Sequence, residues 1–540
     1  MKDSKKTVKK KANQLGKHLF TYIVAILFAL LFVFSVFENL NLLQSSEQKA
    51  QKAEDVKKEM LLHAIDESQS EAGKNNHPEE CEVYVWRENA EAIGVVKTQL
   101  SNMKISFRTT EILKECKNAK ILFVGGGEFS DEEIRTFEEY SHNGMTLFFT
   151  ELPKESLLEQ ERVQKLLGIA SYDGVKNKEG IRITGKLLFD DSRECKEQYS
   201  LPVVTLGKRT EVYVMALQED TEEADTEPLF WRYKPQWGEG NIYVADKMLM
   251  TDATGYAVVA YLFEDLYQTF MYPIVNAYCF IVAGMPYSKN VTSEYLQDVY
   301  GRDAIGIESD ILFPEWNRCK DRYDLIITWY TRETDYTQSN AVMEYYIKSI
   351  DQSREVVGQI CEDSGTMEID SVFDNTLQEW NTGFEWLVEN RVRIPYRTLE
   401  SGNYQIDLFK NQCWMRGTGY NSIYVDVRQF LKEGGEDWVT FSKSLETIFG
   451  VEKQDNPWLE RVSVKEAVYR IMAHQVMQPE IIYEEERIDV SIQFFTGEAY
   501  FYLTTPKQIG GAENAEVEQI AEDIYLVKVT NEVATIFFEK

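Results

Sequence analysis

The sequence predicts an α/β protein with an N-terminal transmembrane helix, an α/β sheet domain, a divergent (β/α) barrel and a C-terminal β-sandwich-like domain. Three observations lead to this fold class. An uncharged apolar run lies near the amino terminus, and continuous apolar runs then alternate with amphipathic segments. From about residue 479 the pattern changes to the two-residue alternation that is typical of strands.

The first predicted element is a transmembrane helix over residues 19–37. These 19 residues carry no charge, and 14 of them are Leu, Ile, Phe or Val. At the rise of an α-helix they span roughly 28 Å, close to the thickness of the hydrocarbon core of a bilayer. Seven lysines precede the run and only Glu38 closely follows it, so residues 1–18 are expected in the cytoplasm and the bulk of the chain outside. A cleaved signal peptide is the alternative, but no small-residue cleavage pattern follows Phe37.

The composition of the whole chain, with 44% apolar and 27% charged residues, is that of a protein whose remaining part is soluble and globular. Its length predicts two to four domains. The formal net charge is −31, and residues 1–17 contribute seven lysines against Asp3, or +6, which leaves −37 for the rest. Nucleic acid is therefore excluded as an expected partner.

The cysteines predict neither a zinc ribbon nor a dense disulfide framework. There are seven, an odd number, and no two of them form a Cys-x-x-Cys pair. Cys279 and Cys319 lie in apolar or aromatic stretches, which favours buried small side chains.

Residues 38–80 predict a charged helical stalk, and the folded part is expected to begin with a strand at residues 82–86. A helix (90–102), a strand (105–108), a helix (111–117) and a buried strand (119–124) follow. Three glycines, 125–127, then favour a tight turn over a phosphate cradle, because the dinucleotide and P-loop patterns are absent. Ser130 and Glu133 form a capping box that opens a helix closed by Asn143 and Gly144, and a strand at 145–150 completes a βαβ unit.

Three segments further characterise residues 81–275: "NGMTLFF" at 143–149, "LLGI" at 166–169 and "GEGNIYVADKML" at 238–249. In this pattern residues 81–275 resemble the class I glutamine amidotransferase-like domains of bacterial envelope proteins. In that family a cysteine nucleophile stands on the turn after a strand, whereas the comparable turn here holds glycine. No amidotransferase chemistry is expected.

Residues 276–478 contain an apolar run at 278–286, the segments 302–303 and 312–316, and a predicted strand at 323–328. In this pattern they resemble a degenerate polysaccharide deacetylase-like barrel. The family needs an aspartate pair after its first strand and two histidines four residues apart to hold a metal ion. Ala283 and Gly284 stand in place of the aspartates, and no two of the five histidines are four apart. We therefore predict no metal site and no cofactor, and His474 is interpreted as a packed core residue.

Carboxylates and aromatic side chains are the remaining candidates for chemistry. A glycosidase needs only two suitably spaced acids, and if the chain is a hydrolase the predicted pair is Asp310 and Glu315. Sugar rings stack their apolar faces on aromatic side chains while their hydroxyls bind carboxylates. The predicted carbohydrate-binding residues are Trp316, which is expected in a loop, Trp329, Tyr330 and Asp303.

The end of the chain, 479–540, predicts a β domain built of hairpins. Residues 487–503 form two alternating strands around a turn at Thr496 and Gly497, and 524–529 pairs with 533–538.

Taken together, the two resemblances imply a non-catalytic, membrane-anchored component of an exopolysaccharide system that binds polysaccharide or other envelope biosynthesis proteins. A carboxylate-dependent glycoside hydrolase and a structural envelope scaffold remain as alternatives.

Overall fold

The computed structural model describes residues 52, 56–68, 81–184, 187–189, 192–217, 227–283, 294–330, 370–373, 384–387, 391–394, 397–398, 404–431, 434 and 437–539. The chain divides into two compact units, Met1–His63 and Ala64–Lys540, and the features below belong to the second unit. The predicted transmembrane helix, 19–37, lies outside the described residues. Within the described part of the chain, no helix is long and apolar enough to cross a membrane. Of the predicted stalk, residues 56–68 are helical.

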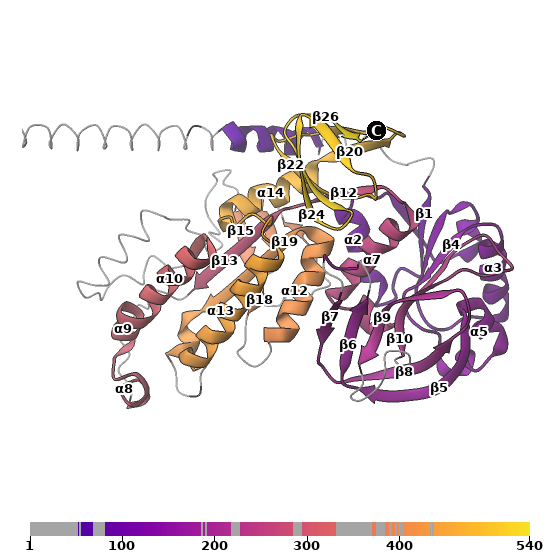
Figure 1. Ribbon diagram of the computed structural model, residues 1–540, viewed down its shortest axis with the longest axis horizontal. Coiled ribbons are helices and arrows are strands. Elements are labelled where there is room, and N and C mark those ends of the chain that lie inside the picture. The colour runs from indigo at the N-terminus through magenta and orange to yellow at the C-terminus, as the bar shows by residue number, and fades with distance from the viewer. Residues whose placement is uncertain are drawn as a thin grey trace, which may run out of the picture. The chain divides into compact units, whose positions relative to one another are not determined.

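A mixed nine-stranded sheet forms the first part of this unit (Figure 1), in the order β2-β1-β3-β4-β11-β10-β9-β6-β7. Its parallel half contains β1 (Val83–Trp86), β2 (Phe107–Thr110), β3 (Ile121–Val124), β4 (Thr146–Phe149) and β11 (Ile242–Ala245). Every residue of β3, β4 and β11 is buried, as expected of continuous apolar strands covered on both faces. The predicted strands at 82–86, 119–124 and 145–150 are confirmed.

The antiparallel half of this sheet was not predicted from the sequence. It contains β6 (Gly180–Thr184), β7 (Ser192–Cys195), β9 (Thr210–Leu217) and β10 (Pro228–Tyr233). The strands β5 (Ile169–Lys178) and β8 (Tyr199–Leu206) form a separate antiparallel pair.

Three helices of this part lie where the sequence predicts them: α2 (Ile93–Asn102), the 3₁₀ helix η1 (Leu113–Asn118) and α3 (Asp131–His142). The others, α4 (Glu155–Leu158), α5 (Glu161–Leu167), α6 (Lys247–Met250) and α7 (Thr254–Leu266), were not predicted. The capping box is confirmed, because the Ser130 hydroxyl accepts from the Glu133 amide while the Glu133 carboxylate accepts from the Ser130 amide. Gly144, with φ +92°, follows the end of α3 as predicted.

A four-stranded parallel sheet lies in the middle of the chain, in the order β14-β13-β19-β18. Its strands are β13 (Ala277–Ala283), β14 (Ile327–Tyr330), β18 (Arg397–Thr398) and β19 (Tyr420–Asp426). In the part of the chain that the structure describes, this sheet is open and does not close into the expected barrel. Another sheet contains β15 (Asp370–Phe373), β16 (Glu385–Leu387) and β17 (Arg391–Ile394).

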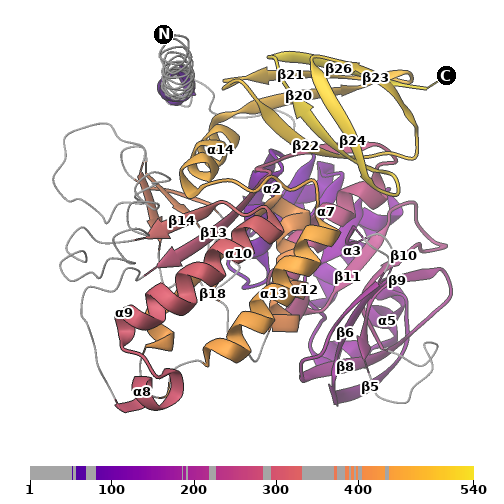
Figure 2. The ribbon, with the colours of Figure 1, turned by 60° about the vertical axis from the view of Figure 1, so that its left-hand side comes forward.

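Helices alternate with the strands of the middle part. They are α8 (Glu294–Tyr300), α9 (Ala304–Ile307), the π-helical turn η3 (Glu308–Leu312), α10 (Phe313–Tyr323), α12 (Tyr404–Thr418), the 3₁₀ helix η5 (Val427–Phe430), α13 (Trp438–Asp455) and α14 (Val464–Val476). Helices α10 and α13 lie side by side (Figures 1 and 2). The strand predicted at 323–328 begins only at Ile327, because α10 continues to Tyr323 and Asp324 caps it in the left-handed conformation.

The end of the chain, together with one earlier strand, forms two four-stranded antiparallel sheets, and the strands from the end of the chain are drawn in yellow tones in Figure 2. One contains β12 (Phe270–Ile274), β22 (Ala499–Thr504), β25 (Ile524–Val529) and β24 (Ala515–Ala521). The other contains β20 (Gln478–Tyr483), β21 (Arg487–Gln493), β26 (Val533–Phe538) and β23 (Ile509–Glu513).

The strands predicted in this part are confirmed, but the two hairpins are wrong. β21 and β22 belong to different sheets, and so do β25 and β26. Apolar side chains from both sheets share one core, which includes Val490, Phe501, Val527 and Ile536. The chain therefore crosses between two facing sheets at each predicted turn. In addition, β12 comes from the segment assigned to the α/β domain, and it pairs with β22 across more than 220 residues of sequence.

Candidate functional site

The structure places Trp316 in the core and not in a loop. It lies in the first turns of α10, and its side chain has no exposed area. Its ring centroid is 5.7 Å from that of Phe280 and 5.0 Å from that of Trp438. The prediction failed because Pro314 opens a helix, where the fixed φ of proline is well accommodated, and does not hold a loop. No sugar ring can reach Trp316 in this arrangement.

The other predicted binding residues are also held by their own surroundings. Trp329 of β14 is 7% exposed, and its ring lies 5.3 Å from that of Phe313. Tyr330 ends β14, and its side chain lies outside the described residues. Asp303 caps α9, since its Oδ1 accepts a hydrogen bond of 2.7 Å from the amide of Gly306.

The predicted hydrolase pair, Asp310 and Glu315, stands on two consecutive helical segments, five residues apart. That separation turns the two side chains by roughly 140° around a helix axis. Each carboxylate is engaged in a surface ion pair, Asp310 with Arg302 at 3.0 Å and Glu315 with Arg318. Both acids are thus explained by local ion pairing.

His474 is a core residue, as predicted. It is 3% exposed, and burial lowers the pKa of its imidazole to about 3, so that the ring is neutral. Cys279 and Cys319 are buried, as expected, and Cys361 lies outside the described residues. Among the described residues, no group of three His, Cys, Asp or Glu side chains is placed to hold a metal ion.

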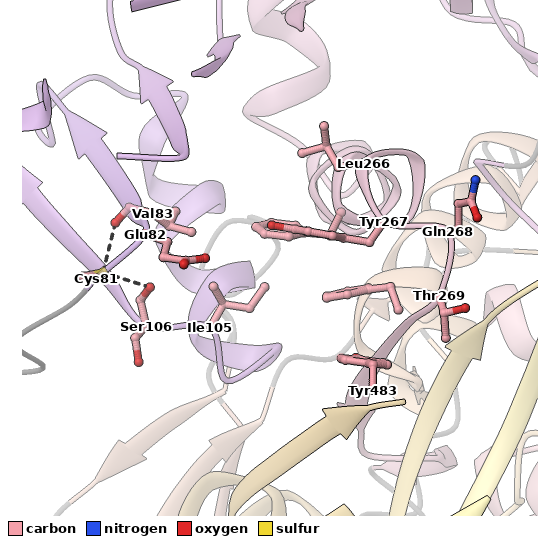
Figure 3. Close-up of a pocket in the computed structure, with 12 residues that line it drawn as sticks. Cys81, Glu82, Val83, Ile105, Ser106, Leu266, Tyr267, Gln268, Thr269 and Tyr483 are labelled. Atoms are coloured by element: carbon pink, nitrogen blue, oxygen red, sulfur yellow. Dashed lines mark hydrogen bonds between the residues drawn. The ribbon is translucent and has the colours of Figure 1, made fainter. Parts of the chain in front are cut away.

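The strongest candidate for a ligand site is a pocket of about 650 Å³, which we call the aromatic groove (Figure 3). Four separate segments of the chain line it: the start of the folded part, the residues before β2, the end of α7 with its connection to β12, and the end of β20. Its residues are Cys81, Glu82, Val83, Ile105, Ser106, Phe263, Leu266, Tyr267, Gln268, Thr269, Phe270 and Tyr483.

Stacked rings form one wall of the groove. Tyr267 and Phe270 have centroids 6.0 Å apart and planes within 22° of parallel, and both stack on Phe263. Tyr267 and Tyr483 are 40% and 43% exposed, so large ring surfaces remain in contact with solvent. Exposed apolar ring faces beside hydrogen-bonding groups are the features that bind sugars.

Local structure explains why these rings gather. Helix α7 ends at Leu266, and Tyr267 has extended backbone angles while its amide still donates to the Phe263 carbonyl at 2.9 Å. The chain then enters β12, which in the described part of the chain is an edge strand paired with β22. Its Pro273 suits an edge position. The hydroxyl of Tyr483 accepts a hydrogen bond of 2.9 Å from the amide of Met271, which ties the end of β20 to β12.

The opposite wall is the polar edge of the nine-stranded sheet. The thiol of Cys81 donates to the carbonyls of Val83 and Ser106, each at 3.2 Å, and so joins the start of β1 to the residue before β2. Figure 3 shows the carboxylate of Glu82 directed into the space in front of Tyr267. Burial, and then the charge of Glu82, raise the pKa of Tyr267, and burial raises that of Tyr483 to about 12. Both phenols are therefore neutral hydrogen-bond donors near neutral pH.

Sequence reasoning missed this site because its walls come from residues near 82, 267 and 483. The available signal was two aromatic residues, Tyr267 and Phe270, which the structure places at the junction of α7 and β12. Nothing in the sequence brought them together with Tyr483.

A second pocket, of about 520 Å³, lies where β4 and β11 end. The two strands are paired in parallel, and Glu151 and Asp246 follow them in this pocket. Burial raises the pKa of both carboxyl groups. The carboxyl ends of parallel strands are the usual position of ligand sites in open α/β sheets. The predicted glycine turn lies at the same edge, and a Cβ on Gly125 would come within 2.7 Å of the Arg87 carbonyl oxygen, so this turn is tightly packed.

No family model and no curated protein matches this chain. Among solved structures the chain is similar to Agd3, a carbohydrate deacetylase, with 9% identity and a TM-score of 0.49 over 85% of this chain and 99% of that one. It is also similar to a catalytic mutant of Gan42B, a GH42 beta-galactosidase from G. stearothermophilus, with 16% identity and a TM-score of 0.25 over 37% and 32% of the two chains. Alpha-L-fucosidase isoenzyme 2 from Paenibacillus thiaminolyticus has 8% identity and a TM-score of 0.23 over 85% and 49%. These neighbours are carbohydrate-active enzymes, and TM-scores below 0.5 assign neither a fold nor an activity to this chain.

Proposed function

We propose that this chain binds a polysaccharide in the aromatic groove without cleaving it, as a membrane-anchored, extracytoplasmic component of an exopolysaccharide synthesis or export system. Other envelope biosynthesis proteins are the expected protein partners. The anchor rests on the uncharged run at 19–37 and the lysines before it.

The observation that carries the proposal is the pair of exposed tyrosines, Tyr267 and Tyr483, in one groove. Exposed aromatic faces lose apolar contact with water when a sugar ring covers them, and the neighbouring Gln268, Thr269 and Ser106 supply hydrogen-bonding groups. A pocket with apolar walls and a few polar groups is the common form of a small-ligand site.

The residues of the groove favour binding over cleavage. Glycosidases of the common types need two carboxyl groups on either side of the bond that is cleaved. Among the described residues that line the groove, Glu82 is the only acid.

Co-sedimentation of the purified full-length chain with neutral and amino-sugar polysaccharides tests the proposal. Tyr267→Ala and Tyr483→Ala should each weaken binding by about 1–3 kcal/mol if the rings are central to the site. Phe537→Ala is the matched control, because Phe537 is an exposed aromatic residue outside the groove. Equal binding by all three variants, or no binding by the native chain at millimolar glycan, would contradict the proposal.

A hydrolase remains the second candidate, and its best support is now the pair Glu151 and Asp246. These acids end neighbouring strands and share a pocket. Release of soluble fragments by the native chain, abolished in Glu151→Gln or Asp246→Asn, would favour cleavage over binding alone.

A further inference from the structure

We propose that the aromatic groove selects a glycan with free amino groups, and that Glu82 is the residue that recognises the ammonium group. This inference rests on the proposed function, and it adds the class of sugar and the residue that determines specificity.

The negative charge of the groove favours a cationic ligand. Among the twelve described residues that line the groove, Glu82 alone carries a charge, and the whole chain has a formal net charge of −31. A negative field raises the local concentration of cations and lowers that of anions. An anionic sugar in the groove would bring a second negative charge close to Glu82.

The position of the Glu82 carboxylate relative to Tyr267 also favours an ammonium group. The Glu82 carboxylate points into the space in front of the Tyr267 ring (Figure 3). A sugar ring stacked on Tyr267 can then direct an equatorial ammonium group to this carboxylate, and an ammonium group near an aromatic face gains a further electrostatic attraction. An N-acetyl group at the same position lacks the charge and cannot form the ion pair.

The carboxylate of Glu82 is accessible to a ligand cation. Glu82 forms an ion pair with Lys120, but the two side chains are 54% and 66% exposed. An ion pair that is open to water contributes little free energy. A carboxylate also accepts several hydrogen bonds at once, so a ligand ammonium group can share Glu82 with Lys120 or replace it.

The test compares oligomers of glucosamine and N-acetylglucosamine that have the same length and linkage, at mildly acid pH, on the full-length chain. The native chain should prefer the glucosamine oligomer. Glu82→Gln should weaken glucosamine binding about threefold to tenfold while leaving N-acetylglucosamine binding unchanged. Lys120→Gln should strengthen glucosamine binding, since it removes the competing cation.

Glu516→Gln on β24 is the matched control, because it removes one exposed negative charge outside the groove and should have no effect on either oligomer. If Glu82→Gln weakens both oligomers equally, or neither, the inference is wrong. The proposed function would still stand in that case provided that Tyr267→Ala weakens N-acetylglucosamine binding. If Tyr267→Ala leaves both oligomers bound as tightly as the native chain does, the groove is not the glycan site and both proposals fail.

Discussion

Arg416 of α12 donates to the carboxylate of Glu264 in α7, and both side chains are buried, with exposures of 0% and 4%. The same guanidinium donates to the hydroxyl of Tyr272 in β12 at 2.9 Å. It also lies 5.9 Å from the ring centroid of Tyr502 in β22. One cation therefore joins the α/β part, the middle part and the C-terminal sheets.

Loss of one partner of this pair should strongly destabilise the protein. Arg416→Met leaves the Glu264 carboxylate buried beside the hydroxyl of Tyr272, and breaking a buried ion pair in this way costs about 3–5 kcal/mol. Chemical denaturation of both proteins measures the difference. Lys165→Met breaks an exposed pair with Glu161 and is the control, with an expected change below about 0.5 kcal/mol. Similar effects of the two substitutions would contradict the role of Arg416.

Glu452 should make stability depend on pH. Its carboxylate accepts from Tyr278 and, at 3.1 and 3.0 Å, from Asn411 and Asn421. Burial nevertheless raises its pKa from 4.5 to about 7. Between these two values the folded protein holds a proton that the unfolded chain has lost, so stability falls as the pH rises through this window.

The contribution of Glu452 to this loss should be about 3 kcal/mol. Glu452→Gln removes the titration, so the difference in unfolding free energy between native and variant protein should change by that amount between pH 4.5 and 7. Denaturation series at several pH values measure this difference. Two parallel curves would show that Glu452 does not titrate in this range.

Trp316 should matter for folding and not for binding. Trp316→Ala leaves a large cavity between Phe280 and Trp438, at a cost of about 3–5 kcal/mol. Trp316→Phe should cost less, because it keeps a ring and removes an indole N–H that has no hydrogen-bond partner among the described residues. Glycan affinity of the folded Trp316→Phe protein should equal that of the native chain. A loss of affinity with unchanged stability would restore Trp316 as a binding residue.

Asp310 and Glu315 should be tolerant positions. Asp310→Asn and Glu315→Gln each weaken an ion pair at the surface, so stability should change by less than about 1 kcal/mol. Any release of reducing ends from polysaccharide should also be unaffected. If either substitution abolished such a release, the hypothesis that Asp310 and Glu315 are the catalytic acids of a hydrolase would be correct.

A reporter fused after Lys540 tests the predicted topology. The lysines before residue 19 should keep the amino terminus in the cytoplasm, so the reporter should be active only as an extracytoplasmic fusion. Replacing the seven lysines with glutamine is the control, since it should weaken this orientation. A reporter that is active in the cytoplasm would overturn the orientation.

The sequence alone predicted several individual elements. The strand at 119–124 and the one at 145–150 are runs of apolar residues, and α3 begins where the Ser130 capping box is. The strands at 524–529 and 533–538 match β25 and β26. These features depend on neighbours within about four residues, and such interactions can be read along the chain.

Only the tertiary structure decided which strands pair and where the ligand site lies. A turn such as that at Thr496 and Gly497 permits a hairpin and equally permits a crossing between two sheets, and burial of Val490 and Phe501 in one shared core selects the crossing. In the same way, Trp316 is a core residue because α10 turns its side chain toward Phe280, and Tyr267 is a surface residue because α7 ends beside an edge strand. Burial depends on contacts between residues far apart in the chain, so local sequence patterns identify strands and helices but not which aromatic rings remain exposed.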